Sequence, residues 1–262
     1  MRITWYGTAA LLLETGDAVL AFDPFEGIPP EAAHPEKGPF PHRKELQRAD
    51  RVFVTHGHFD HVLQIPALYR GTGSVIFATK TPVRTLGKRG VPAERLRTIR
   101  PGSVVTLGGT TVRAFQGRHC RFDAALLFRT LFGKQARENP GQLFRLLRRH
   151  FACPEKGEIL CYEVAHGGKR IMILGSLGLD PKTAYPRGAD LLILPFQGKS
   201  DLPAAALPIL ERLRPKSVLL DHYDDSFPPM SAEIDTKEFC RMVTKRGFPC
   251  RAFRKEETFR IG

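Results

Sequence analysis

The sequence predicts an α/β fold, because short apolar runs typical of strands alternate along the chain with amphipathic segments typical of helices. The chain has 262 residues, of which 42% are hydrophobic and 26% charged, a balance that allows a sizeable buried core. No internal repeat, low-complexity tract or linker interrupts this pattern. We therefore expect one domain over residues 1–262.

Apolar runs separated by Gly7-Thr8 and Gly16-Asp17 predict three strands at the start of the chain. Six prolines between residues 24 and 41 then predict a long loop, which is either a pocket wall or a solvated excursion. The expected strands lie at 2–6, 9–14, 18–23, 51–55, 74–79, 104–107, 111–115, 158–165, 169–174, 191–194 and 217–220. The expected helices lie at 62–69, 81–90, 202–213 and 236–246.

Residues 122–152 break this alternation and form a candidate helical insertion. Leucines and phenylalanines are mixed there with arginines, which predicts two basic amphipathic helices separated near Asn139-Pro140-Gly141. We favour an interpretation in which their apolar face covers the core of the domain. The alternatives are a lid over a site and a contact with a membrane surface.

The chain is strongly basic, with 40 Lys and Arg against 27 Asp and Glu and a net charge of +13. Such a charge attracts phosphate esters, nucleic acid or acidic lipid. No recognised nucleic-acid-binding motif accompanies it, so a small anionic substrate ranks ahead of nucleic acid. The sequence leaves the oligomeric state open.

Three features favour a cytoplasmic location. The apolar stretches are too short to cross a bilayer, and the first residues lack the pattern of a secretory signal. The five cysteines are scattered and contain no CxxC pair, which argues against both a disulfide framework and a zinc ribbon.

Residues 52–61, VFVTHGHFDH, carry the clearest chemical signal: an apolar strand that ends in four potential metal ligands. His56 and His58 are two positions apart, so both can point the same way from extended backbone. Asp60 and His61 follow where a helix would begin, so the segment can face two neighbouring ions. Imidazole and carboxylate together suit zinc, manganese or iron. The motif therefore predicts a divalent metal site, with zinc or manganese preferred and one or two ions bound.

The His-x-His-x-Asp-His motif after a strand resembles the signature of the metallo-β-lactamase fold superfamily. Residues 3–7, ITWYG, and 20–24, LAFDP, are similar to the opening strands of the branch that contains L-ascorbate-6-phosphate lactonase. The resemblance extends from residue 3 to about residue 223. It implies a four-layer αββα sandwich with metals at one edge, between the two sheets.

The resemblance also implies roles for particular residues. Asp23 would accept hydrogen bonds from ligating imidazoles, and Asp60 would orient the nucleophile or shuttle its proton. The implied ligands are His56, His58 and His119 for the first ion and Asp60, His61 and His222 for the second.

The chain departs from the family pattern at Ser176. The family usually has Gly-Asp there, with a carboxylate that bridges both metals, whereas this chain has Gly175-Ser176. A hydroxyl group is a much poorer ligand. Three consequences stay open: two ions without a bridging carboxylate, one ion at the three histidines, or loss of catalysis.

These features predict a metal-dependent hydrolase in which metal-bound hydroxide attacks a small anionic ester, either a sugar-phosphate lactone or a phosphodiester. Arg118 and Lys199 are candidate contacts for the anion, and Tyr223 is a candidate donor to an oxyanion. For each of these three the alternative is an ordinary surface or packing role. The alternative function is a catalytically impaired metal- or ligand-binding protein, which Ser176 motivates.

Overall fold

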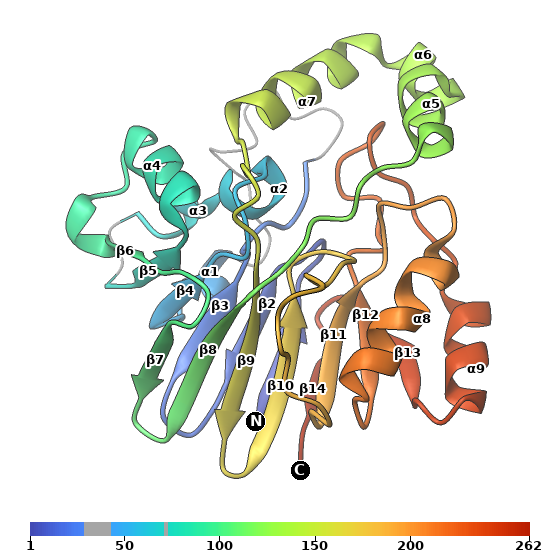
Figure 1. Cartoon of the computed structure of the whole chain (residues 1–262). Coiled ribbons are helices and arrows are strands. Elements are labelled where there is room, and N and C mark those ends of the chain that lie inside the picture. The colour runs from blue at the N-terminus through green and yellow to red at the C-terminus, as the bar shows by residue number, and fades with distance from the viewer. Residues whose placement is uncertain (29–42, 71–72) are drawn as a thin grey trace.

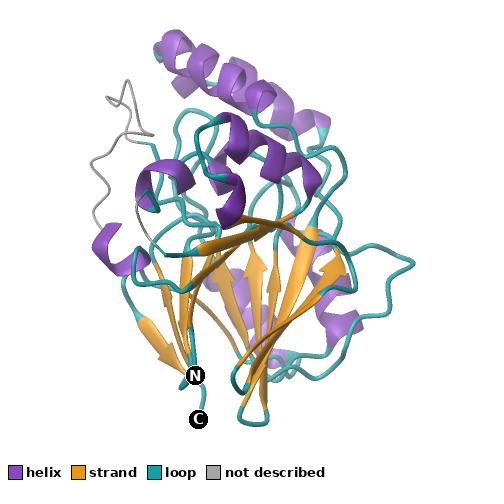
Figure 2. Cartoon of the chain, turned by 90° about the vertical axis from the view of Figure 1, so that its left-hand side faces the viewer, coloured by secondary structure: helices purple, strands orange, loops and turns teal. Residues whose placement is uncertain are grey.

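The computed structural model describes residues 1–28, 43–70 and 73–262 (Figure 1). Most of the loop predicted over 24–41, including the proposed pocket wall, lies outside these residues. Two seven-stranded sheets face each other, and helices flank them (Figures 1 and 2). The α/β prediction is therefore confirmed.

The first sheet has the order β14-β1-β2-β3-β4-β5-β6. Strands β1 to β3 pair antiparallel, and β3 to β6 pair parallel. The strands are β1 (Arg2–Trp5), β2 (Leu11–Glu14), β3 (Val19–Phe22), β4 (Arg51–Phe53), β5 (Val75–Ala78), β6 (Leu96–Thr98) and β14 (Thr258–Arg260).

The second sheet has the order β13-β12-β11-β10-β9-β8-β7. It is antiparallel from β7 to β10 and parallel from β10 to β13. The strands are β7 (Val104–Leu107), β8 (Thr110–Gln116), β9 (Leu160–His166), β10 (Lys169–Leu174), β11 (Leu191–Pro195), β12 (Val218–Asp221) and β13 (Cys250–Ala252).

Three apolar clusters define four layers. The middle cluster joins side chains of both sheets, such as Trp5, Phe22 and Tyr162. The cluster on the outer face of the first sheet includes residues of α1 (Arg43–Leu46), α2 (Phe59–Val62), α3 (Ile65–Leu68) and α4 (Lys80–Lys88). The cluster on the outer face of the second sheet includes residues of α8 (Leu202–Leu213) and α9 (Lys237–Lys245). Because each strand alternates its side chains between two faces, this arrangement is the αββα sandwich that the resemblance implies.

The predicted helix 62–69 is replaced by the two short helices α2 and α3. Helix α2 begins at Phe59, inside the His-rich motif, and Pro66 lies in the first turn of α3. Proline fits the first turn of a helix but disrupts an interior turn, so one continuous helix is disfavoured here. A short 3-10 turn at Ala93–Arg95 precedes β6.

Residues 122–152 contain three helices rather than the two expected: α5 (Ala124–Phe132), α6 (Lys134–Glu138) and α7 (Pro140–Ala152). The additional break falls at Gly133, where a Cβ atom would lie 2.3 Å from the carbonyl oxygen of Arg129. The expected covering of the core is met only in part, since α5 has no buried residue and α7 buries Gln142 and Leu146. Within the described ranges, none of the helices combines the length and apolar character needed to cross a bilayer.

Candidate metal centre

The His-rich segment starts where β4 leaves the first sheet. Tyr162, from β9 of the second sheet, donates its hydroxyl hydrogen to the carbonyl oxygen of Val54 at 2.6 Å. This bond fixes the end of β4 against the opposite sheet. His58 keeps extended backbone and directly precedes α2, so Asp60 and His61 lie in the first turn of that helix. The predicted sequence of strand, turn and helix therefore presents the four side chains at one edge, between the sheets.

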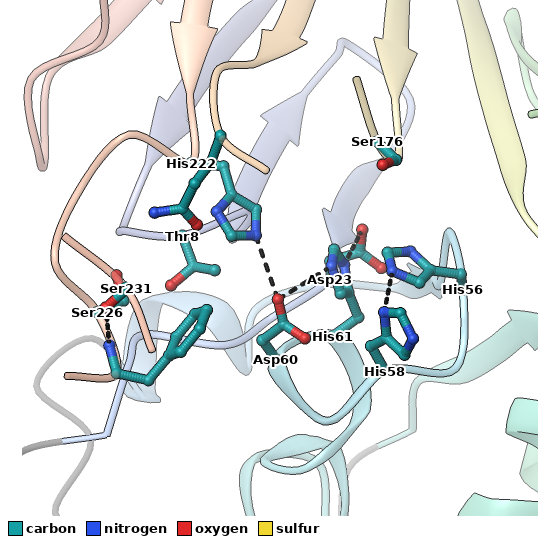
Figure 3. Close-up of polar contacts among 12 residues, drawn as sticks. Thr8, Asp23, His56, His58, Asp60, His61, Ser176, His222, Ser226 and Ser231 are labelled. Atoms are coloured by element: carbon teal, nitrogen blue, oxygen red, sulfur yellow. Dashed lines mark hydrogen bonds and ion pairs between the residues drawn. The ribbon is translucent and has the colours of Figure 1, made fainter. Parts of the chain in front are cut away.

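The first ligand cluster consists of His56, His58 and His119. Their candidate ligand atoms all lie within 4.8 Å of one another. His56 Nε2 is 3.1 Å from His58 Nδ1 (Figure 3), and the rings of His58 and His119 are 4.6 Å apart between centroids. His119 follows β8, so residues more than fifty positions apart in the sequence converge here.

Hydrogen bonds on the far side of two rings leave nitrogen lone pairs facing the cluster. The hydroxyl of Thr55 donates to Asp23 at 2.6 Å, so its oxygen is available to accept from Nδ1 of His56 at 3.0 Å. Nδ1 of His119 donates to the carbonyl oxygen of Cys120 at 2.7 Å. In each ring the proton is thereby held on Nδ1, and Nε2 keeps the lone pair that a metal needs.

Burial keeps the three imidazoles neutral. It lowers the pKa of His56 well below its ordinary value, lowers the pKa of His58 to about 3, and lowers the pKa of His119. Neighbouring histidines lower these pKa values further. Neutral imidazole is the ligand form of histidine, so the donor set fits a divalent metal ion.

The second ligand cluster consists of Asp60, His61 and His222. Asp60 Oδ2 lies 3.2 Å from Nε2 of His222 and 3.5 Å from Nε2 of His61 (Figure 3). His222 follows β12 with a positive φ of 54°, and its backbone N–H donates to the carbonyl oxygen of Thr8 at 2.9 Å. This contact ties the end of β12 to the turn after β1.

Opposite charges dominate the second cluster. Burial alone would lower the pKa of His61, but the carboxylates of Asp23 and Asp60 raise it to about 10. Burial alone would raise the pKa of Asp60, but His61 and His222 hold it well below its ordinary value. The cluster thus consists of one carboxylate between two imidazoles whose pKa values are raised, so that both imidazoles bind protons more readily than usual. A divalent ion bound there would take the place of those protons.

Asp23 and Thr55 support both clusters from behind. Asp23 is buried and its Oδ2 lies 2.9 Å from Nδ1 of His61. The backbone N–H of Thr55 donates to Asp23 Oδ1 at 2.8 Å. Asp23 thus lies within hydrogen-bond distance of His61 and Thr55. Sequence reasoning missed Thr55, although its place directly before His56 was the available signal.

Ser176 is hydrogen-bonded to the residue that follows His119. It follows β10, is buried, and its Oγ accepts a hydrogen bond from the backbone N–H of Cys120 at 3.1 Å. Figure 3 draws no hydrogen bond or ion pair between Ser176 and the labelled histidines. The preceding Gly175 is required by close packing, since a Cβ atom there would lie 2.4 Å from Cβ of Thr55. Ser176 thus fixes the backbone next to His119.

The three predicted substrate contacts have different surroundings. Arg118 is exposed beside His119, and Lys199 is partly buried next to Ser200, whose N–H donates to Asp123 at 2.8 Å. Tyr223 donates its hydroxyl hydrogen to the carbonyl oxygen of Phe253, and its ring stacks on Trp5 at 5.3 Å. The structure thus uses Tyr223 in packing.

His150, on α7, also reaches the first cluster, and sequence reasoning missed it. Its ring centroid lies 4.8 Å from that of His58. Gly57 permits this approach, because a Cβ atom there would lie 2.4 Å from the carbonyl oxygen of Pro154, in the segment after α7. No local motif marks His150, which lies in a basic amphipathic helix far along the chain.

The two clusters predict opposite pH dependences for the metal-free protein. His58 has a pKa of about 3 against an ordinary 6.5, so acidification below about pH 6.5 protonates the unfolded chain first and lowers the free energy of unfolding. His61 has its pKa raised to about 10, so its stabilising effect is complete below about pH 6.5 and is lost as the pH rises toward 10. We expect chelator-treated protein to be most stable near neutrality in urea unfolding between about pH 5 and about pH 9. Stability that rises steadily to the alkaline end would contradict this prediction.

Comparisons with known proteins agree with this geometry. A family model described as the beta-lactamase superfamily domain matches residues 19–223. A metal-dependent hydrolase of Brucella anthropi is 34% identical over 119 residues. The match covers 45% of this chain and 48% of that relative, so it spans about half of the relative's length. A ribonuclease Z of Bradyrhizobium is 30% identical over 219 residues, with 70% of this chain and 69% of the relative covered. The structure of a metallo hydrolase of Ignicoccus hospitalis superposes with a TM-score of 0.64 at 19% identity and covers 100% of this chain and 99% of that one.

Proposed function

Because the chain belongs to the metallo-β-lactamase superfamily, we propose that it is a metal-dependent hydrolase that acts on a small anionic ester, either a phosphodiester or a sugar-phosphate lactone. The observation that carries the proposal is the pair of adjacent ligand clusters, His56, His58 and His119 beside Asp60, His61 and His222. Zinc or manganese suits these nitrogen and oxygen donors. A divalent cation supplies acidification of water and polarisation of the scissile bond.

The chain's own residues divide the remaining work. Asp60 contacts both His61 and His222, and its pKa lies well below the ordinary value. A carboxylate that ionises so readily is a weak base, so we assign Asp60 the orientation of the attacking water rather than storage of its proton. Asp23 and Thr55 hold the imidazoles in position from behind. Arg118 and Lys199 would attract the anionic group of the substrate.

Three further observations support parts of this proposal. The net charge of +13 favours an anionic substrate. The similarity to a ribonuclease Z favours a phosphodiester over a lactone. All five cysteines are free thiols, which supports a reducing, cytoplasmic setting.

The test is an assay with a nitrophenyl phosphodiester and a sugar-phosphate lactone, using protein as purified, after chelation, and after return of zinc or manganese. We expect turnover of one substrate class that is lost on chelation and restored by metal. Turnover that survives chelation, or no turnover of either substrate with metal present, would contradict the proposal.

The alternative is a catalytically impaired binding protein, because Ser176 stands where the family usually has a bridging carboxylate. A Ser176→Asp variant distinguishes the two in the same assay. If the natural chain is a competent enzyme, we expect the variant to gain little, because the two ligand clusters already provide the donors that the reaction needs. A large gain in both metal content and turnover would identify the natural chain as impaired.

A further inference from the structure

The helical segment 122–152 exposes an unusual amount of apolar surface. Among the described residues, every exposed large hydrophobic side chain except Val104 belongs to this segment. Phe128 and Phe132 on α5 are 67% and 59% exposed, and Phe144 and Phe151 on α7 are 62% and 77% exposed. Scattered exposed leucines are ordinary, but large apolar side chains gathered in one segment mark an interaction surface.

These side chains share helix faces. Phe128 and Phe132 are one turn apart on α5, and their ring centroids are 5.1 Å apart. On α7, Phe144, Arg148 and Phe151 follow the spacing of one helical face. All three helices lie at one end of the molecule, with α7 above α2 (Figure 1), while both termini lie at the opposite end (Figures 1 and 2).

The same segment is strongly cationic. Residues 124–152 contain six lysines and arginines against one glutamate, a net charge of +5 with His150 neutral. This charge favours one of two possible partners for the apolar faces, a second copy of the chain or a lipid surface. A second copy would bring its own five positive charges into the contact, whereas negatively charged headgroups would complement them.

A cationic hollow continues this surface beyond α7. It has a volume of about 490 Å³ and is lined by Arg84, Lys88, Arg89, Lys156 and Phe151, together with threonines and small residues. No carboxylate lines it. Basic side chains thus lie directly beside the most exposed phenylalanine of the segment.

We propose that segment 122–152 docks the protein on an anionic phospholipid surface. The phenylalanines of α5 and α7 enter the boundary between headgroups and acyl chains, and the surrounding arginines and lysines bind headgroup phosphates. Docking of this kind requires no membrane-spanning helix. Because α7 ends beside the first ligand cluster, with His150 facing His58, docking holds that cluster next to the lipid.

The test is co-sedimentation of the full chain with vesicles of phosphatidylcholine alone and with vesicles in which phosphatidylglycerol replaces part of it. We expect binding to the anionic vesicles, weaker binding at high salt, and little binding to the neutral ones. A Phe128→Ser/Phe132→Ser variant should bind at least about tenfold more weakly, since two of the large apolar side chains that enter the lipid are lost.

Matched controls separate this surface from general effects. Val104→Ser removes an exposed apolar side chain from β7, outside the segment, and should leave binding unchanged. Arg137→Glu/Arg148→Glu should abolish binding, whereas the same change of charge on α9, Arg241→Glu/Lys245→Glu, should weaken it much less. If the phenylalanine variant fails to fold by circular dichroism, the two charge variants still decide the outcome.

Three results would overturn the proposal: no binding of the natural chain to anionic vesicles, equal binding to neutral vesicles, or equal loss in the segment and control variants. A dimer in sedimentation equilibrium that the Phe128→Ser/Phe132→Ser change dissociates, without vesicle binding, would assign the surface to a second copy instead. The vesicle measurement does not depend on hydrolysis, so its failure would leave the proposed activity standing.

Discussion

The His58→Ala variant is expected to lose the ion of the first cluster and to lower turnover by more than about a hundredfold, since even residues behind a metal ligand contribute about 10- to 100-fold. His58 is one of three neutral imidazoles in that cluster, and its Nδ1 lies 3.1 Å from Nε2 of His56. Removing it leaves two histidines, fewer protein ligands than a catalytic zinc site usually has. Turnover with saturating zinc or manganese, and the rise in melting temperature that metal produces, measure the loss.

The control for His58→Ala is His166→Ala, a histidine at the end of β9 that hydrogen-bonds to Thr110. It should keep both its turnover and its metal-dependent rise in melting temperature. If His58→Ala kept them as well, the first cluster would not be the site of the reaction.

Asp60→Asn is expected to reduce turnover by about a hundredfold or more, because the change removes a carboxylate of the second ligand cluster that orients the attacking water, and even residues behind a metal ligand contribute about 10- to 100-fold. The amide has nearly the same shape as the carboxylate but carries no charge. It cannot complete the ion pairs with His61 and His222, and the pKa values of both histidines should fall. An ion at the second cluster should therefore bind much more weakly. The first cluster does not include Asp60 and should keep its ion.

The matched control is Asp235→Asn, an exposed carboxylate whose Oδ1 accepts from the N–H of Lys237 near the start of α9. Asparagine can make the same contact, so turnover should not change. Full activity of Asp60→Asn would show that the reaction does not use the second cluster. A pH–rate profile of the two variants adds a readout that a loss of stability alone would not alter.

Much of the fold could be predicted because its central strands are nearly continuous apolar runs. Strands β10, β11 and β12 are mostly or fully buried, and such runs are typical of strands covered on both faces. The missed strands, β6, β13 and β14, have three residues each and only partial burial. They lie at the edges of the sheets, where pairing with a neighbour rather than side-chain burial defines them, and their sequences carry no apolar signal.

The candidate site divides in a similar way. His56, His58, Asp60 and His61 lie within six residues, so the motif alone points to a metal site. His119 and His222 are brought in by long-range strand pairing and needed the resemblance to be recognised. The position of His150 beside the first cluster could not be predicted, because it requires the segment after α7 to pass close to Gly57.

The exposure of apolar side chains in segment 122–152 could not be predicted from the sequence either. An amphipathic pattern shows that a helix has an apolar face but not whether another part of the chain covers it. Here α5 has no buried residue, so the membrane-surface alternative gains over simple packing on the core. Ser176 could be recognised from the sequence as a departure from the family pattern. Its hydrogen bond with the backbone of Cys120 is visible only in the structure.

Metal stoichiometry tests most directly whether each of the two ligand clusters holds a divalent ion. Elemental analysis of untagged protein equilibrated with zinc or manganese should give two ions per chain. The content should fall to one in His222→Ala, which alters only the second cluster. A natural chain that binds one ion or none, or that keeps the same content in the variant, would contradict this expectation.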